Sequence, residues 1–314
     1  MMRTGTITYK SHQSMTLPNF LIIGAPKAGT TSLYYYLRQH PQIFMSSIKE
    51  PNFFATDGLE RQLKDPFDRV WIDQSITELE KYCSLFSNVN DEKAIGEAST
   101  SYLGSRHAAH RIHYHVPDVR LVAVLRQPVE RAYSHFCHLG RDGHEQAPDF
   151  RSGIRGEEER IRNHVLWGRY IHSGFYYEQL RPYFELFDRD QIRILLYDEL
   201  RGSRSEMLQD IFQFLEVDED FEPNTSVQHN VSGRPRSVLL HNLLVKGNPI
   251  KNTLQPLMPY WMQRVAVGVK NLNLSRPAPL DPELAMELQA TYREDLLKLQ
   301  DLLDRDLSGW LQRY

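Results

Sequence analysis

Short apolar runs alternate with stretches of helical periodicity along most of the chain. The apolar runs predict buried strands at residues 20–23, from 43, from 94 into a polar turn by 102, at 119–125 and at 192–197. Apolar residues three or four positions apart predict helices at 30–39, 106–115, from 128 onward, 170–187, 198–215 and 281–311. Strands that alternate with helices indicate parallel βαβ units. The pattern therefore predicts an α/β fold with a central, mainly parallel sheet flanked by helices.

The weakly patterned segments define the expected domain organisation. Residues 1–16 are polar and lack an apolar core, so we expect a flexible N-terminal arm before a single domain at 17–314. Residues 56–92 are expected to be irregular to helical. Residues 139–168 are charged and contain glycine, and are expected to form an exposed insertion or lid.

Residues 24–32, Gly-Ala-Pro-Lys-Ala-Gly-Thr-Thr-Ser, join an expected strand to an expected helix. A glycine-bounded loop at a helix N-terminus offers backbone N–H groups and the positive end of the helix dipole to an anion. The spacing of Gly24, Gly29 and Thr31 nearly matches the nucleoside-triphosphate loop G-x-x-x-x-G-K-[ST]. The lysine position is Thr30, however, and a lysine occurs three residues earlier, at Lys27. With no Walker-B partner for Mg²⁺ evident, an anionic donor that reacts without a metal fits better than ATP; a purely structural turn is the alternative.

A second candidate anion site follows the apolar strand at 119–125. Arg126 stands at its carboxyl end, where open α/β sheets bind ligands. Pro128 suits the first turn of the next helix, on which Arg131, Ser134 and His138 fall on one face. We expect an anion to bind where the strand end and this face meet; a surface helix with solvated arginines is the alternative. A later glycine turn, 230–237, contains Arg234 and Arg236 and suits closure over an anion.

Composition narrows the classes of function. The 314 residues are 41% hydrophobic and 25% charged, as in soluble globular proteins. The formal charge of −3 argues against a general nucleic-acid-binding protein, which needs a basic face. Two cysteines, Cys83 and Cys137, give no disulfide framework or zinc site and favour a reduced compartment. Apolar runs of about five residues are far below the roughly twenty that span a membrane. Four histidines at 107–115 suggest a metal, but no carboxylate or cysteine shares their face, so we expect a solvated helix face and no metal.

Four segments together resemble the sulfotransferases that use 3′-phosphoadenosine 5′-phosphosulfate (PAPS), from about Pro18 to the C-terminus. Residues 24–32 resemble the family's 5′-phosphosulfate loop, and 125–134 resemble its 3′-phosphate element. Residues 232–236 resemble the loop over the adenosine. Residues 49–54, Lys-Glu-Pro-Asn-Phe-Phe, resemble the catalytic-glutamate segment of the carbohydrate-modifying, heparan-sulfate-like and bacterial branch.

The resemblance implies a P-loop-NTPase-like sulfotransferase fold and an enzyme of this class. The reaction would be in-line, metal-independent transfer of a sulfuryl group from PAPS to a hydroxyl or amine of a small-molecule or glycan acceptor. The product of the donor would be adenosine 3′,5′-bisphosphate (PAP). Residues 140–175 and 240–280 would be acceptor-side insertions, with aromatic residues such as Trp167, Tyr170, Tyr260 and Trp261. A cytoplasmic location is expected, and a homodimer is left open.

The resemblance also implies roles for individual residues. Lys27 would neutralise charge growing on the bridging oxygen, Glu50 would be the base and His138 a secondary catalytic candidate. Arg126 and Ser134 would hold the 3′-phosphate. The other expected donor contacts lie in two loops: Pro26, Ala28, Gly29, Thr30, Thr31, Ser32, and Ser232, Gly233, Arg234, Arg236.

Two positions depart from the family pattern. Where the carbohydrate branch often has Glu-Lys before Ser/Thr-Pro, this chain has Glu97 followed by Ala98, so a lysine contacting acceptor or donor is absent. The usual aspartate after the strand-end arginine is Gln127. Three alternatives stay open: a non-catalytic module that binds PAP, a P-loop kinase or NTPase, and a structural Glu50 that pairs with Lys49 or caps a turn.

Overall fold

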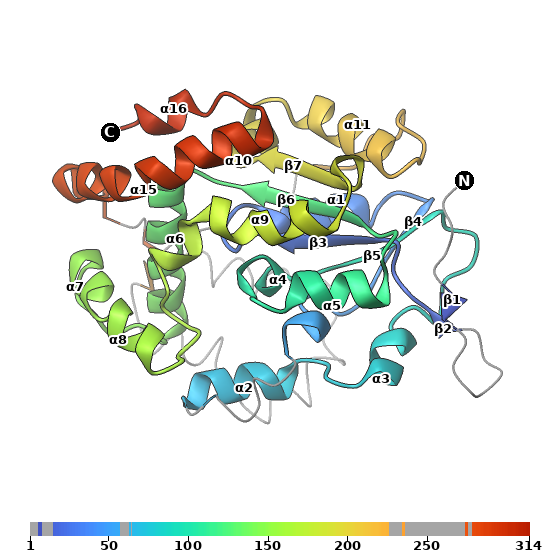
Figure 1. Ribbon diagram of the computed structural model, residues 1–314, viewed down its shortest axis with the longest axis horizontal. Coiled ribbons are helices and arrows are strands. Elements are labelled where there is room, and N and C mark those ends of the chain that lie inside the picture. The colour runs from blue at the N-terminus through green and yellow to red at the C-terminus, as the bar shows by residue number, and fades with distance from the viewer. Residues whose placement is uncertain are drawn as a thin grey trace.

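Five parallel strands form the centre of the molecule (Figure 1). The computed structural model describes residues 6–7, 15–56, 63, 65–225, 234–235, 274–275 and 278–314. The sheet has the order β4-β5-β3-β6-β7. Its strands are β4 (Ile43–Met45), β5 (Ala94–Ala98), β3 (Phe20–Gly24), β6 (Arg120–Leu125) and β7 (Ile192–Leu196). All five point toward the end of the sheet where α6 (Pro128–Asp142) stands (Figure 1).

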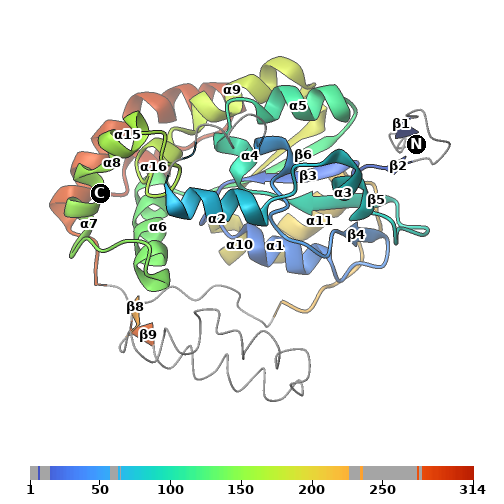
Figure 2. The same ribbon diagram turned by 90° about the horizontal axis from the view of Figure 1, so that it is seen from below.

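Helices cover both faces of the sheet, as the view in Figure 2 shows. One face is covered by α1 (Thr30–Leu37), α10 (Tyr197–Gly202) and α11 (Arg204–Phe214). The other is covered by α4 (Ser101–Gly104), α5 (Ala108–His115), α9 (Tyr176–Leu186) and α15 (Pro282–Leu303). Burial on both faces explains why the strands read as continuous apolar runs. The predicted α/β architecture is confirmed.

The centre of the sheet is packed tightly enough to fix the strand that enters the candidate anion loop. Every residue of β3 is buried, and so are residues 121–125 of β6. A Cβ at Gly24 would lie 2.6 Å from the Cβ of Leu103, too close for any side chain. Glycine therefore lets α4 pack directly on the end of β3, which places the start of the loop.

The observed helices are shorter and more numerous than the periodicity predicts. The expected helix at 198–215 is divided at Ser203 into α10 and α11, and 170–187 becomes helical only from Tyr176, after a 3₁₀ turn (His172–Gly174). The C-terminal segment forms α15 and α16 (Ser308–Leu311), separated by Asp304 with φ 50°. Residues 56–92 contain α2 (Pro66–Gln74) and α3 (Leu79–Ser84).

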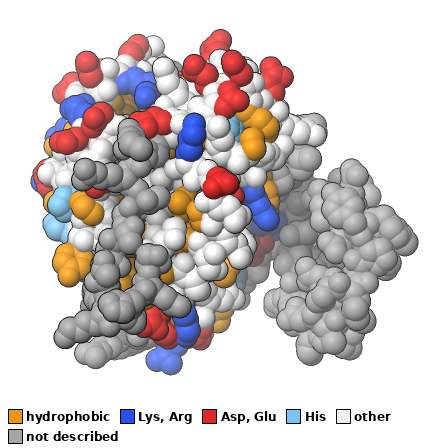
Figure 3. All heavy atoms as spheres, turned by 90° about the vertical axis from the view of Figure 1, so that its right-hand side faces the viewer, with side chains coloured by type: hydrophobic (Ala, Val, Ile, Leu, Met, Phe, Trp, Pro, Cys, Tyr) orange, Lys and Arg blue, Asp and Glu red, His pale blue; other side chains and the backbone are white. Residues whose placement is uncertain are grey.

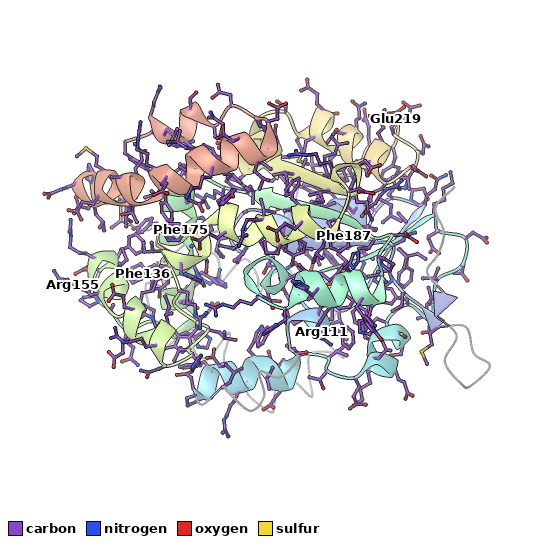
Figure 4. All side chains as sticks on the ribbon, viewed as in Figure 1. Arg111, Phe136, Arg155, Phe175, Phe187 and Glu219 are labelled. Atoms are coloured by element: carbon purple, nitrogen blue, oxygen red, sulfur yellow. The ribbon has the colours of Figure 1, made fainter. Side chains whose placement is uncertain are left out.

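The segment 139–168 differs from the exposed insertion or lid that its charged sequence predicts. Helix α6 continues to Asp142 and is followed by α7 (Phe150–Arg155) and α8 (Glu157–Arg162). Phe150 is buried against Phe136 of α6, which is labelled in Figure 4, with ring centroids 5.4 Å apart. Sparse apolar anchors thus hold the segment on the core, and its many charges conceal them in the sequence.

Two small antiparallel pairs lie outside the sheet. β1 (Thr6–Ile7) pairs with β2 (Met15–Thr16), so the described part of the N-terminal arm folds back on itself. β8 (Arg234–Pro235) pairs with β9 (Leu274–Ser275) and lies beside α6. No helix within the described ranges has the length and apolar character to cross a bilayer. On the face shown in Figure 3, acidic side chains gather along the upper edge and basic ones are scattered.

Candidate active site

The loop between β3 and α1 has the conformation of an anion-binding turn. The amide of Ala25 donates to the Val124 carbonyl (2.8 Å), which ties the loop to β6. Lys27 and Gly29 both have positive φ angles, 70° and 93°. Glycine suits position 29 because a φ of 93° strains other residues, and a Cβ there would also lie 3.1 Å from the Tyr197 ring. No side chain among the described residues caps α1, so its N-terminus faces the loop as an anion-binding helix end would.

Lys27 stands in this loop as a partly buried cation. Burial lowers its pKa to about 8, and the nearby positive charge of Arg141 acts in the same direction. Asp142 opposes the change, while Arg126 and Lys49 add to it. Three cations and one carboxylate thus act on Lys27. The site has an excess of positive charge, which a bound anion would offset.

Arg126 is held at the carboxyl end of β6, as predicted. Its Nη1 donates to the Lys27 carbonyl (3.3 Å), and its guanidinium lies 4.7 Å from the centre of the Tyr197 ring. Its Nε and Nη2 contact the Glu130 carboxylate at 3.3 and 3.2 Å. Ser134 is buried one helical turn beyond Glu130. The structure thus brings Arg126 next to the Lys27 loop, although the two lie about a hundred residues apart.

Glu50 reaches the same region from the turn after β4. Its amide donates to the Ala98 carbonyl (2.9 Å), which fixes it at the end of β5. Oε1 is 2.6 Å from Lys49 Nζ, and Oε2 accepts from the Thr100 amide (2.8 Å). The side chain remains 35% exposed. Glu50 therefore makes the contacts of the structural alternative, which are an ion pair with Lys49 and a hydrogen bond that caps a turn. The exposed part of its carboxylate can still contact a substrate.

Glu97 is a buried carboxylate that the sequence analysis did not select as a site residue. It is fully buried in β5 and accepts hydrogen bonds from Tyr102 Oη (2.6 Å), Ser99 Oγ (2.8 Å) and Tyr82 Oη (3.2 Å). Burial raises its pKa to about 7, the hydrogen bonds lower it, and the charge of Glu50 raises it further. A lone charged residue inside an apolar strand, Ala94–Ala98, is the signal that could have identified it.

His138 lies near Lys27 but is held by its own helix. Its Nδ1 is 2.7 Å from Arg141 Nη2 and 3.4 Å from Asp142 Oδ2. Burial, followed by the charge of Lys27, lowers its pKa to about 3. The lowered pKa makes the ring a weak base, so hydrogen bonding suits it better than proton abstraction. Arg141, which sequence reasoning missed, is buried and also pairs with Asp142 (Nε to Oδ1, 2.8 Å).

One expectation about a cluster needs correction. Arg131 does not join Ser134 and His138 at an anion site: it is fully buried, and its Nη2 donates to the Tyr170 carbonyl inside the protein. The rotation of α6 on its apolar face turns Arg131 inward. Of the four histidines at 107–115, His107, His110 and His113 are exposed, as expected for a solvated helix face. No group of three or more metal-ligating side chains occurs in the part of the chain that the structure describes.

The remaining predicted donor contacts fall into two sets. Pro26, Ala28, Thr30, Thr31 and Ser32 lie in the loop and first turn of α1, around Lys27. Ser232, Gly233 and Arg236 lie outside the described residues, as do Tyr260 and Trp261. The backbone of Arg234 is described and belongs to β8, beside α6.

A phosphate-type loop on a parallel sheet, with a displaced lysine and a strand-end arginine, is the arrangement that the resemblance to sulfotransferases implied. The sequence profile described as "Sulfotransferase family" matches residues 18–223, about two thirds of the chain. The chain belongs to the sulfotransferase family. The predicted family resemblance is confirmed.

A solved structure agrees with this assignment. The sulfotransferase from Alicyclobacillus acidocaldarius superimposes with a TM-score of 0.74 at 32% sequence identity, and the match covers 94% of this chain and 98% of that one. It extends beyond residue 223, where the family profile stops. The part of the chain that the structure describes therefore has the sulfotransferase fold.

Curated relatives are more distant and longer. The chain is 25% identical to the membrane-associated sulfotransferase kil1 of Dictyostelium discoideum, over 74% of this chain and 64% of that protein. It is 27% identical to human carbohydrate sulfotransferase 15, over 64% of this chain and 44% of that protein. It is 24% identical to the mouse bifunctional heparan sulfate N-deacetylase/N-sulfotransferase 4, over 95% of this chain and 31% of that protein. The chain thus spans between about a third and two thirds of the length of these relatives.

Proposed function

We propose that this protein transfers a sulfuryl group from PAPS to a hydroxyl or amine of a carbohydrate or small-molecule acceptor. The observation that supports this most is the convergence of Lys27, Arg126 and Glu50 from three separate strand ends. Arg126 donates to the Lys27 backbone, and Lys49, whose charge acts on Lys27, pairs with Glu50. Membership of the sulfotransferase family gives this geometry its chemistry.

The loop fits the phosphosulfate end of such a donor. Lys27 is surrounded by like charges and by burial that lowers its pKa, and α1 begins without a side-chain cap among the described residues. A bound anion would offset the positive charge around Lys27 and would accept hydrogen bonds from the N–H groups at the start of α1. Lys27 and the α1 end would hold the 5′ end, while Arg126 and Ser134 would hold the 3′-phosphate. When bound, the donor would supply an activated sulfuryl group on a phosphate leaving group.

The protein residues divide the work of the transfer between them. Lys27 would neutralise the charge that develops on the leaving phosphate oxygen, an electrostatic role that does not require a metal. Glu50, aligned by Thr100 and Lys49, would accept the proton of an acceptor hydroxyl. Arg141 would add positive charge beside Lys27. In-line transfer then depends mainly on positioning.

The acceptor is proposed from the relatives and from the position of Glu50. Carbohydrate sulfotransferase 15 and the heparan sulfate enzyme carry carbohydrate acceptors in their names. Ala98 stands where that branch often has a lysine, so this chain lacks one cation there. We therefore propose an acceptor that needs fewer charge contacts at this position, such as a small glycoconjugate.

Incubation with PAPS labelled in the sulfuryl group, together with a panel of saccharides, phenols and amines, tests the proposal. We expect label transfer by the wild type, with retention of PAP binding but little transfer in Glu50→Gln. Binding of PAP without transfer to any acceptor would favour the non-catalytic module. Dependence of activity on ATP and Mg²⁺ would favour a kinase, and absence of PAP and PAPS binding would refute the proposal.

We also propose a cytoplasmic location. Cys83 and Cys137 are both free thiols, as a reducing compartment would keep them. The name of the Dictyostelium relative includes membrane association, so the proposal needs a direct test. Fractionation of source cells should place the protein with the high-speed supernatant; recovery with membranes would contradict it.

A further inference from the structure

Glu130 divides its carboxylate between two arginines that are far apart in the sequence. Its Oε2 contacts Arg126 Nε and Nη2 at 3.3 and 3.2 Å, and its Oε1 contacts Arg313 Nη2 at 2.6 Å. Arg126 comes from the end of β6, Glu130 from the first turn of α6, and Arg313 from the segment after α16. The sequence analysis assigned no role to Glu130 or Arg313.

This carboxylate is placed where it should hinder donor binding. In the proposed function the 3′-phosphate lies between Arg126 and Ser134. Glu130 is four residues from each of them, and Ser134 follows it by one turn on the same helix face. A carboxylate beside a phosphate dianion repels it, and a carboxylate already paired with Arg126 competes for that arginine.

Arg313 offers the carboxylate another partner. Its second nitrogen, Nη1, lies 3.3 Å from Asp198 Oδ2, so the guanidinium bridges two carboxylates from α6 and α10. The backbone that carries it is fixed by Gln289 of α15. Gln289 Nε2 donates to the carbonyls of Leu311 (2.9 Å) and Tyr314 (3.0 Å), and Gln289 Oε1 accepts from the Tyr314 amide (3.1 Å). Arg313 is thus held in place from both sides.

We propose that Arg313 is a positioning residue for the 3′-phosphate site. It neutralises Glu130 and remains that carboxylate's partner when a 3′-phosphate replaces Glu130 on Arg126. Its effect is confined to nucleotides that carry a 3′-phosphate, so it sets discrimination between PAP and adenosine 5′-monophosphate. This inference rests on the proposed function, because it takes Arg126 and Ser134 as the 3′-phosphate ligands.

A double-mutant cycle separates this indirect role from direct phosphate binding. Dissociation constants for PAP and for adenosine 5′-monophosphate would be measured by calorimetry on the whole protein at one ionic strength. The variants are Arg313→Ala, Glu130→Gln and the double variant. We expect Arg313→Ala to weaken PAP binding about tenfold and Glu130→Gln to strengthen it about threefold, within the range of charge-pair effects. In the Glu130→Gln background, Arg313→Ala should change PAP binding by less than about twofold.

Two controls show that the effect is specific. Arg305→Ala removes an arginine of similar exposure (33% against 35%) that pairs with Glu199 instead, and it should leave PAP binding unchanged. Arg313→Lys keeps the charge and should bind PAP within about threefold of the wild type, since one ammonium still reaches Glu130. Thermal unfolding of each variant would verify that it is folded.

Each contrary result overturns the inference in a recognisable way. Equal loss of PAP binding in both backgrounds would show that Arg313 contacts the phosphate itself. Equal loss for PAP and adenosine 5′-monophosphate would show a general structural role. If the wild type does not bind PAP at all, the inference fails together with the proposed function, whereas PAP binding with an additive cycle leaves the proposed function standing and removes this inference alone.

Discussion

The two ends of the candidate donor site balance charge in different ways. At the transfer end, defined by Lys27, Arg141 and Glu50, Arg141 pairs with Asp142, but burial and the neighbouring cations still lower the pKa of Lys27 to about 8. At the anchor end, defined by Arg126, Glu130 and Arg313, each arginine is paired with a carboxylate. An excess of positive charge suits a place where negative charge grows during reaction. Paired charges suit a place that binds a fixed group.

Removing the ammonium of the transfer end should have the largest effect. We expect Lys27→Ala to lower turnover by roughly 10²–10³-fold, the scale of losing one preorganised charge donor, while PAP binds within about fivefold of wild type. Steady-state rates with labelled PAPS measure the turnover, and calorimetry with PAP measures the dissociation constant. Lys81→Ala, a change at an exposed lysine paired with Glu78, is the control. Loss of PAP binding with an unchanged saturated rate would reverse the assignment of the two ends.

The matching change at the anchor end should affect binding instead. Arg126→Ala should weaken PAP binding by about 30–100-fold, since a charged hydrogen-bonding partner of the phosphate is lost. Arg120→Ala is a matched control. Arg120 begins β6, whereas Arg126 follows its end; it is equally exposed (20%) and pairs with Glu216. An unchanged donor affinity with abolished turnover would show that the 3′-phosphate site lies elsewhere.

Glu97 tests whether the transfer end also holds a carboxylate that titrates near neutrality. Its folded-state pKa of about 7 lies above the ordinary value of 4.5, so the folded state keeps a proton that the unfolded chain loses. The resulting stability is present below pH 4.5 and is lost as pH rises to 7. Glu97→Gln should remove about 1–3 kcal/mol of this dependence, measured by urea unfolding at pH 5 and pH 8. If the free energy of unfolding changed equally with pH in the variant and the wild type, Glu97 would be ionised throughout this pH range.

A smaller effect concerns the alkaline limit of activity. Because the Lys27 ammonium must be protonated to stabilise the leaving group, kcat/KM should fall above about pH 8. Arg141→Gln removes a positive charge that lowers the pKa of Lys27. The alkaline fall in kcat/KM should therefore move to higher pH by about half a pH unit. Arg155→Gln, on α7 (labelled in Figure 4), should leave this fall in place. A shift in the opposite direction would rule out Lys27 as the titrating group.

Local sequence was enough to predict the loop and the strand ends. Gly29, Lys27 and Arg126 occupy positions where backbone conformation and strand direction determine what they face, so their spacing carries the information. Glu130, Arg141 and Arg313 could not be predicted in the same way, because their roles depend on tertiary contacts or on helix rotation. Arg131 shows the limit most clearly: helical periodicity placed it beside Ser134, and packing of α6 turned it into the interior.

The measurement that tests the account most directly is the rate of label transfer from PAPS as a function of PAPS concentration. Wild type, Lys27→Ala and Arg126→Ala would be compared with one acceptor. We expect Arg126→Ala to approach the wild-type rate at high PAPS and Lys27→Ala to stay slow at every concentration. An Arg126→Ala rate that saturates far below wild type, a Lys27→Ala rate restored by PAPS, or no transfer by the wild type would contradict the account.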